Sequence, residues 1–166
     1  FLNSGNDKVP LKKELETIQD YLKIQKFRYG EILEDHYDIE KDCEPYLVPK
    51  LIFQPLVENS LYHGIRPKGE KGKILVSAHL QDQKLCLSVY DTGIGMSPEK
   101  LKQVLSSSPT GFGLKKTLER LQYLYGEKDC YHIESQEGSF CRITLYLPLE
   151  KSLPEQSFLG KDENHV

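Results

Sequence analysis

The chain has 166 residues, of which 38% are hydrophobic and 28% charged, and its net charge is −3. This composition is typical of a globular protein with one ordinary domain plus attachments, and the charge gives no reason to expect a nucleic-acid partner. No apolar run approaches the roughly 20 residues of a membrane-spanning helix, and no signal peptide is expected. The four cysteines contain no C-x-x-C pair, which favours free thiols in a reducing compartment over a metal cluster.

The first predicted element is a helix that begins at Pro10 and ends at Gly30, after residues 1–9, which we expect to be frayed. One seam of this helix repeats in alternating steps of four and three residues and consists of Leu11, Leu15, Ile18, Leu22, Gln25 and Tyr29. Such a seam suits a partner helix, as in a dimer, or packing on the chain's own domain. The sequence leaves both possibilities open.

A strand is predicted over residues 32–40, a turn over 42–45, and then a long helix that Pro49 opens and that ends near Arg66. On this helix an apolar or small stripe should pack on a sheet, and it consists of Phe53, Val57, Ser60, Leu61 and Gly64. Glu58, Asn59 and His63 fall outside the stripe. A carboxylate, an amide and an imidazole in one cluster indicate a site for a cation or a polar ligand, and an ordinary polar surface is the alternative.

After a basic, glycine-rich loop at 67–73, two strands with alternating apolar residues are predicted over 74–80 and 85–89, joined by a hairpin at Asp82 and Gln83. The alternation places Asp91 on the apolar side of the second strand. A carboxylate there is unfavourable unless it meets a hydrogen-bond donor, so either the protein or a ligand must supply one.

Two pairs of glycines follow. Gly93 and Gly95 form a turn that permits close backbone approach to a ligand, and a short helix over residues 98–105 leads to a mobile segment, 106–110. Gly111 and Gly113 then open a helix that runs to about residue 125. Its first turn contains Lys115 and Lys116, which work against the helix dipole unless an anion is bound there. Solvated lysines after a flexible loop are the alternative.

Two final strands are predicted over 131–135 and 140–148, followed by a tail, 150–166, that we expect to be disordered. Taken together, the three polar and glycine-rich stretches resemble, in their order, the N, G1 and G2 boxes of the ATP-binding fold shared by gyrase, Hsp90, MutL and histidine kinases. Over residues 10–148 the chain resembles in particular the catalytic domain of sensor histidine kinases, in the subfamily of autolysin-regulating and sugar-responsive bacterial sensors. The segments that carry this resemblance are 11–16, 21–28, 48–49, 54–59, 63–64 and 111–121.

The resemblance implies a two-layer α/β sandwich, in which helices cover one face of a mixed, mostly antiparallel sheet. It implies a dimerisation or connecting helix over residues 1–30, an ATP-binding catalytic domain over 31–149 and the tail beyond. Nucleotide would lie between the helices under a mobile lid at about 97–110.

By the same resemblance, Asn59 would bind Mg²⁺ and Glu58 would polarise or deprotonate the attacking group. Asp91 would accept a hydrogen bond from the adenine amino group. The other residues assigned to ATP binding are His63 on the phosphate side, Gly93, Gly95, Gly111, Gly113, Leu114, Lys115 and Lys116.

Members of the subfamily usually carry a lysine where this chain has Tyr62 and an asparagine where it has Lys116. The lost cation could weaken ATP binding unless Lys115, Lys116 or Arg66 compensates.

The function implied is transfer of the ATP γ-phosphoryl group to a histidine on an upstream helix that this chain lacks, and from there to a response regulator. None of the chain's own histidines is a plausible acceptor. The whole protein is expected to be a homodimer anchored in the membrane, with this part in the cytoplasm. Two other functions stay open: an ATPase switch of the chaperone or mismatch-repair type, and a degenerate, non-catalytic module for nucleotide binding or dimerisation.

Overall fold

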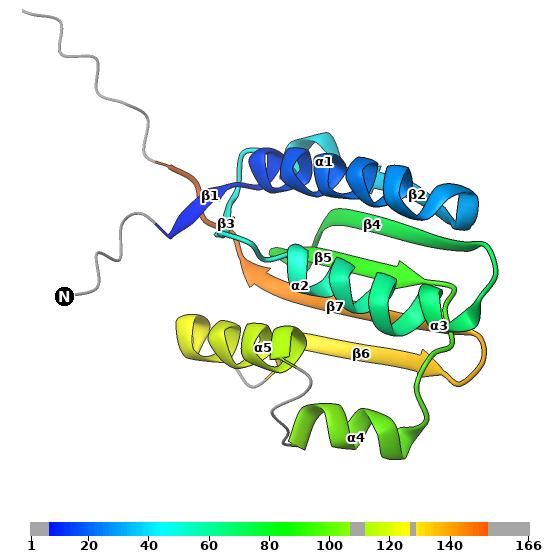
Figure 1. Cartoon of the computed structure of the whole chain (residues 1–166). Coiled ribbons are helices and arrows are strands. Elements are labelled where there is room, and N and C mark those ends of the chain that lie inside the picture. Colours follow the sequence, from blue (N-terminus) through cyan, green and yellow to red (C-terminus); the bar gives the residue numbers. More distant parts are fainter. Residues whose placement is uncertain (1–6, 107–111, 127–128, 153–166) are drawn as a thin grey trace, which may run out of the picture.

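A five-stranded sheet forms one layer of the protein, in a computed structural model that describes residues 7–106, 112–126 and 129–152 (Figure 1). The strands in spatial order are β2 (Leu33–Ile39), β4 (Gly72–Gln81), β5 (Lys84–Asp91), β7 (Phe140–Pro148) and β6 (Tyr131–Gln136). The β2–β4 pair is parallel and the other pairs are antiparallel. The predicted mixed, mostly antiparallel sheet is therefore confirmed.

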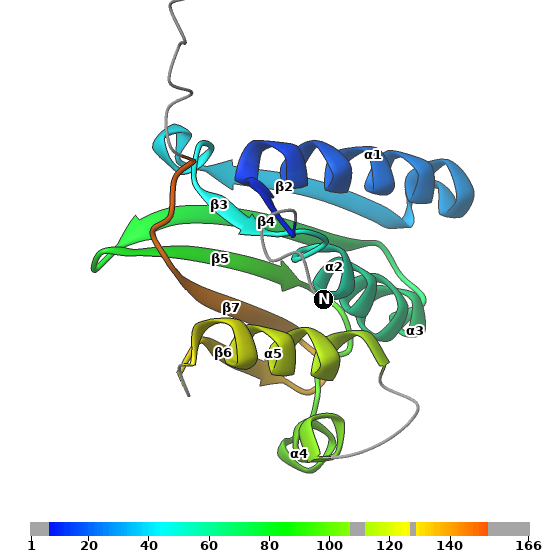
Figure 2. The same ribbon diagram turned by 90° about the vertical axis from the view of Figure 1, so that its left-hand side faces the viewer.

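Helices form the second layer and cover one face of the sheet, as Figures 1 and 2 show. They are α1 (Leu11–Tyr29), α2 (Gln54–Asn59) with its π-helical continuation η3 (Ser60–Ile65), the short α3 (Arg66–Lys68), and α5 (Phe112–Tyr125). Helix α4 (Pro98–Ser106) is set apart, beyond α5 (Figure 2). In the described part of the chain, no helix is long and apolar enough to cross a membrane.

Strand register explains why one face of the sheet is buried. Val76, Val89 and Ile143 lie in one row across β4, β5 and β7, and each is at most 1% exposed. Asp91 lies in the adjacent row, between Ile74 and Cys141, on the same face. The hairpin before β5 turns through two residues with positive φ, Asp82 and Gln83, as a two-residue type I′ turn requires. The alternation in the sequence therefore correctly predicted an inward-facing Asp91.

The seam of α1 packs on the chain's own domain. Leu11, Ile18 and Leu22 are fully buried and belong to the same core as the sheet residues. The sequence left open whether the seam packs on a partner helix or on the chain's own domain, and the structure shows the second. The homodimer and the domain boundary at residue 30 stay predictions.

The long helix begins at Gln54 and not at Pro49, so its predicted start was wrong. Pro49 ends a short strand, β3 (Leu47–Pro49), which pairs with β1 (Lys8–Pro10). Pro55 is the proline of the helix's first turn, where its missing N–H leaves no hydrogen bond unmade. The predicted stripe on this helix is confirmed, because Phe53, Val57, Ser60, Leu61 and Gly64 are all buried.

Both ends of the chain are more structured than predicted. Lys8 and Val9 lie in β1, although residues 1–9 were expected to be frayed. At the other end, Leu47 donates its N–H to the Glu150 carbonyl at 2.7 Å, and Lys151 pairs with Tyr46. These pairings join segments distant in sequence, which local composition does not report. Residues 1–6 and 153–166 lie outside the described part.

A buried carboxylate on α1 fixes the loop before α2. Leu51 has a φ of 59°, an unfavourable backbone conformation for this residue type, and its N–H donates to Glu14 Oε1 at 3.0 Å. Glu14 is only 5% exposed. A charged hydrogen bond of this kind contributes roughly 1.5–3 kcal/mol, enough to offset the strain at Leu51. Helix α1 therefore helps to place the start of α2.

Candidate functional site

The helix with the predicted site residues changes from α-helical to π-helical hydrogen bonding where it crosses the sheet. It is α-helical to Asn59 and then forms the π-helix η3, which contains His63 and Gly64. A methyl group on Gly64 would come within 2.6 Å of Asp91 Oδ1. The chain here has room for no side chain, so η3 lies directly on the end of β5. Such π-helical segments occur frequently at functional sites.

The turn after β5 is packed just as closely. A Cβ on Gly93 would lie 2.2 Å from the carbonyl carbon of Gly64, and one on Gly95 would lie 2.0 Å from the Gln136 carbonyl oxygen. Both glycines are thus required by contact with the chain's own backbone. Their predicted role in admitting a ligand stays a prediction, since the structure already gives a reason for each.

Asp91 meets two protein donors at this crossing. Its Oδ1 accepts the Gly93 N–H at 2.9 Å, and the Ser60 hydroxyl, from η3, donates to the same carboxylate. Asp91 is nevertheless only 1% exposed, and this burial raises its pKa from 3.8 to about 6 in spite of both hydrogen bonds. The protein therefore stabilises the ionised carboxylate only in part.

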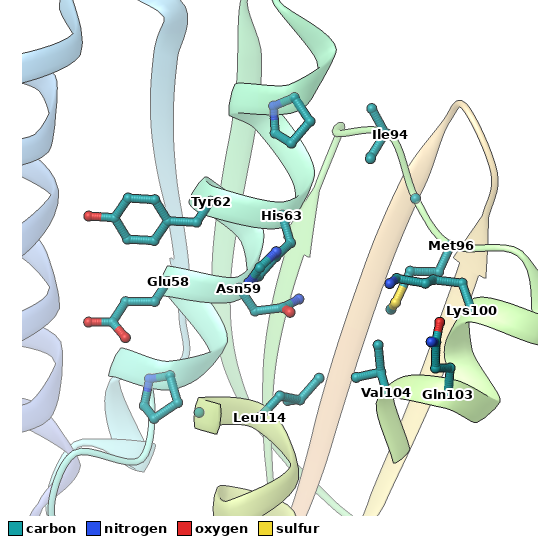
Figure 3. Close-up of a pocket in the computed structure, with 14 residues that line it drawn as sticks. Glu58, Asn59, Tyr62, His63, Ile94, Met96, Lys100, Gln103, Val104 and Leu114 are labelled. Carbon is teal, nitrogen blue, oxygen red and sulfur yellow. The ribbon is translucent and has the colours of Figure 1, made fainter. Parts of the chain in front are cut away.

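A cavity of about 470 Å³ opens beside this crossing, between η3, the turn after β5, α4 and the start of α5 (Figure 3). It is lined by Pro55, Glu58, Asn59, Tyr62, His63, Pro67, Ile94, Gly95, Met96, Lys100, Gln103, Val104, Gly113 and Leu114. Its volume is in the range of small-molecule sites. The three sequence stretches that resemble N, G1 and G2 boxes therefore share one cavity.

Of the predicted site residues, the cavity brings together Glu58, Asn59, His63, Gly95, Gly113 and Leu114. Asp91 and Gly93 do not line it and lie behind it, against Gly64. The two lysines predicted to face the phosphates do not line it either; Lys115 instead forms an ion pair with Glu119, N···O 3.6 Å. Gly111 lies outside the described residues, as does 107–110, so its predicted role stays untested.

Two lining residues point away from the others, toward α1. Figure 3 shows Glu58 and Tyr62 on the α1 side of the helix, and Asn59 directed into the cavity. Gln54 donates to Glu58 Oε1 at 3.1 Å, which orients this carboxylate. Tyr62, present where the resemblance leads one to expect lysine, packs beneath the guanidinium of Arg66, 5.2 Å from the ring centre.

Several lining residues were missed from the sequence. Lys100, Gln103 and Val104 lie on one face of α4, at spacings of three and four residues that bring side chains together on a helix. That spacing was visible in the sequence, but only the fold shows that this face meets the cavity. Within the described residues, no cluster of three or more His, Cys, Asp or Glu side chains is arranged to hold a metal ion.

Comparison with known proteins accounts for this arrangement. Residues 47–151 match the family described as histidine kinase-, DNA gyrase B-, and HSP90-like ATPase, and residues 1–33 match the family described as histidine kinase. The chain belongs to this ATPase family. The match covers the helix with Asn59, the cavity and the whole of the sheet from β4 onward.

Individual relatives are sensor proteins. The chain is 34% identical to the sensor histidine kinase YpdA of Escherichia coli over 149 residues, which are 89% of this chain and 26% of YpdA. It is 34% identical to the sensor protein LytS of Staphylococcus saprophyticus over 159 residues, 92% of this chain and 27% of LytS. The chain therefore spans about a quarter of the length of these relatives.

Solved structures agree on the fold. The catalytic domain of histidine kinase ThkA superposes with a TM-score of 0.62 at 15% identity, covering 86% of this chain and 97% of that domain. The histidine kinase domain of a blue-light-activated kinase from Erythrobacter litoralis gives 0.63 at 16% identity, covering 85% of this chain and 62% of that one. The predicted two-layer fold of this ATPase family is confirmed.

Because the pKa of Asp91 is raised, the free energy of unfolding should depend on pH. A carboxyl group with a folded-state pKa near 6 favours the folded protein while it is protonated, and this contribution is lost as the pH rises from about 4 through 6. Asp91→Asn removes the titration. The free energy of unfolding of the variant, relative to the native chain, should therefore increase by about 2–3 kcal/mol between pH 4 and pH 7, measured by urea unfolding. A pH-independent difference would contradict the burial argument.

Proposed function

We propose that this ATPase domain binds ATP with Mg²⁺ and transfers the γ-phosphoryl group to a histidine on a helix outside this chain. A response regulator would then receive the phosphoryl group. The proposal rests on the family match and on the sensor histidine kinases among the relatives. The observation that carries it is the shared cavity, where the residues of the three boxes meet.

Asp91 is proposed to accept a hydrogen bond from the adenine amino group. An ionised carboxylate has about four acceptor positions, and Gly93 and Ser60 account for two. Because burial disfavours the ionised state of Asp91, a further donor from the ligand would stabilise a charge that the protein leaves partly uncompensated.

Asn59 is proposed to hold Mg²⁺ through its side-chain oxygen. The side chain points into the cavity (Figure 3), and Mg²⁺ commonly takes few protein ligands and completes its shell with phosphate oxygens and water. The donor set fits this cation, since the described residues that line the cavity include no cysteine and no cluster of histidines, which softer metals prefer. When bound, Mg²⁺ neutralises charge on the phosphate groups.

Glu58 is proposed to polarise the attacking histidine. Its carboxylate lines the cavity and is oriented by Gln54, on the side that faces α1. A base must be held within reach of the proton that it accepts, which the hydrogen bond from Gln54 favours. We further propose that the whole protein is a membrane-anchored homodimer, with this domain in the cytoplasm.

The adenine contact is tested by Asp91→Asn. We expect nucleotide affinity to fall by about 5- to 150-fold, the equivalent of roughly 1–3 kcal/mol for a buried charged hydrogen bond, as measured by calorimetry. Asp82→Asn, in the hairpin before β5, is the matched control and should bind normally. Equal ATP affinity in the Asp91 variant would show that this residue has a structural role only.

The metal contact is tested by Asn59→Ala. This variant should bind adenosine as the native chain does but lose the tightening of ATP binding when Mg²⁺ is added, because the cation then lacks its protein ligand. Binding is measured by titration with and without Mg²⁺. Alanine is a better helix former than asparagine, so loss of folding is not expected. An unchanged response to Mg²⁺ would refute the assignment.

Phosphoryl transfer is tested with γ-labelled ATP and a separate polypeptide that carries the acceptor helix of the parent protein. We expect alkali-stable label on its histidine, and a rate lowered about 100-fold or more by Glu58→Gln with ATP binding retained. ATP binding without transfer would favour a non-catalytic module. Hydrolysis without transfer would favour an ATPase switch.

A further inference from the structure

The charges on the cavity wall are few. Of the described residues that line it, Glu58 and Lys100 carry formal charges at neutral pH, and Glu58 is directed toward α1. A nucleoside triphosphate carries about four negative charges, so a site for its phosphates needs cationic groups or bound cations. Among the described residues that line the cavity, Lys100 is the one lysine or arginine.

Other cations close to the cavity are occupied in different contacts. The guanidinium of Arg66 lies over two aromatic rings, 4.6 Å from the ring centre of Tyr29 and 5.2 Å from that of Tyr62. Lys68 donates to the Thr92 carbonyl at 3.0 Å. Lys115 pairs with Glu119. None of the three residues that the sequence suggested as substitutes for a missing lysine, Arg66, Lys115 and Lys116, lines the cavity.

The backbone at Lys100 is fixed relative to the sheet. Met96 donates its N–H to Ser135 Oγ, on β6, at 2.7 Å, and the Lys100 N–H is capped by Ser97 Oγ at 3.1 Å. The first turn of α4 is thereby anchored to the sheet edge. From this turn the Lys100 side chain extends into the cavity, toward the side of Asn59 and His63 (Figure 3).

We propose that Lys100 binds the phosphate groups of the nucleotide and gives the site its preference for tri- and diphosphates over the nucleoside. The inference rests on the proposed function, because it takes the ligand to be ATP. It assigns to the first turn of α4 the cation that the sequence analysis sought at Arg66 on α3 and at Lys115 and Lys116 on α5. His63 would then face the same phosphates from the opposite wall.

The test compares Lys100→Gln with Lys102→Gln, an exposed lysine two residues further along α4 that does not line the cavity. Calorimetry with Mg²⁺ measures the affinity of each variant for ATP, ADP and adenosine. Lys100→Gln should weaken ATP binding about 5- to 20-fold, ADP binding less, and adenosine binding not at all, since only the phosphates lose a charged partner. Lys100→Arg should restore most of the ATP affinity, and Lys102→Gln should behave as the native chain.

Each other result has a distinct meaning. Unchanged ATP affinity in Lys100→Gln overturns the inference and leaves the proposed function intact. An equal loss for ATP, ADP and adenosine also overturns it, because Lys100 would then act on the shape of the site. Failure of the native chain to bind any of the three overturns the proposed function together with the inference.

Discussion

The helix that carries Asn59 and His63 can lie on the turn after β5 because Gly64 and Gly93 have no side chains where the two segments cross. Gly64 meets Asp91 there, and Gly93 meets the backbone of Gly64. An added methyl group on Gly64 would overlap the Asp91 side chain, and one on Gly93 would overlap the backbone of Gly64, which cannot move aside as a flexible side chain can. This contact sets the distance between η3 and the sheet, and with it the position of the cavity.

The same crossing explains the state of Asp91. Close packing removes water from the carboxylate, and the two hydrogen bonds from Ser60 and Gly93 hold its position without fully compensating its charge. A buried acidic residue whose ionised form lowers the stability of the fold is a candidate for a functional role. A donor on a bound purine is the reason that we propose.

Helix α1 supports the site from the other side. Its seam is buried in the domain core, its Glu14 holds the loop before α2, and Tyr29 stacks with Arg66 beyond η3. Burial raises the pKa of Tyr21 on α1, and the nearby Tyr62 hydroxyl and Glu58 carboxylate raise it further. The wall of the cavity that carries Glu58 and Tyr62 thus faces α1.

The sequence by itself determined the elements with strong local patterns and the residues that these patterns bring together. Steps of four and three predicted the buried seam of α1, and alternation predicted the strands and an inward Asp91. The order of the polar and glycine-rich stretches indicated the ATPase family and six residues of the cavity. The seam and the strands follow from side-chain periodicity, which neighbouring residues largely decide, whereas the family and the cavity residues followed from the resemblance of the three stretches to known motifs.

Only the tertiary structure decided the rest. The pairing of β1 with β3, the start of the helix at Gln54 and the π-helical turn depend on contacts between distant segments. That Lys100 lines the cavity, and that Arg66 and Lys115 do not, depends on where the fold places α3, α4 and α5. A sequence lists the charges, but their availability to a ligand is decided by the surfaces that meet when the chain folds.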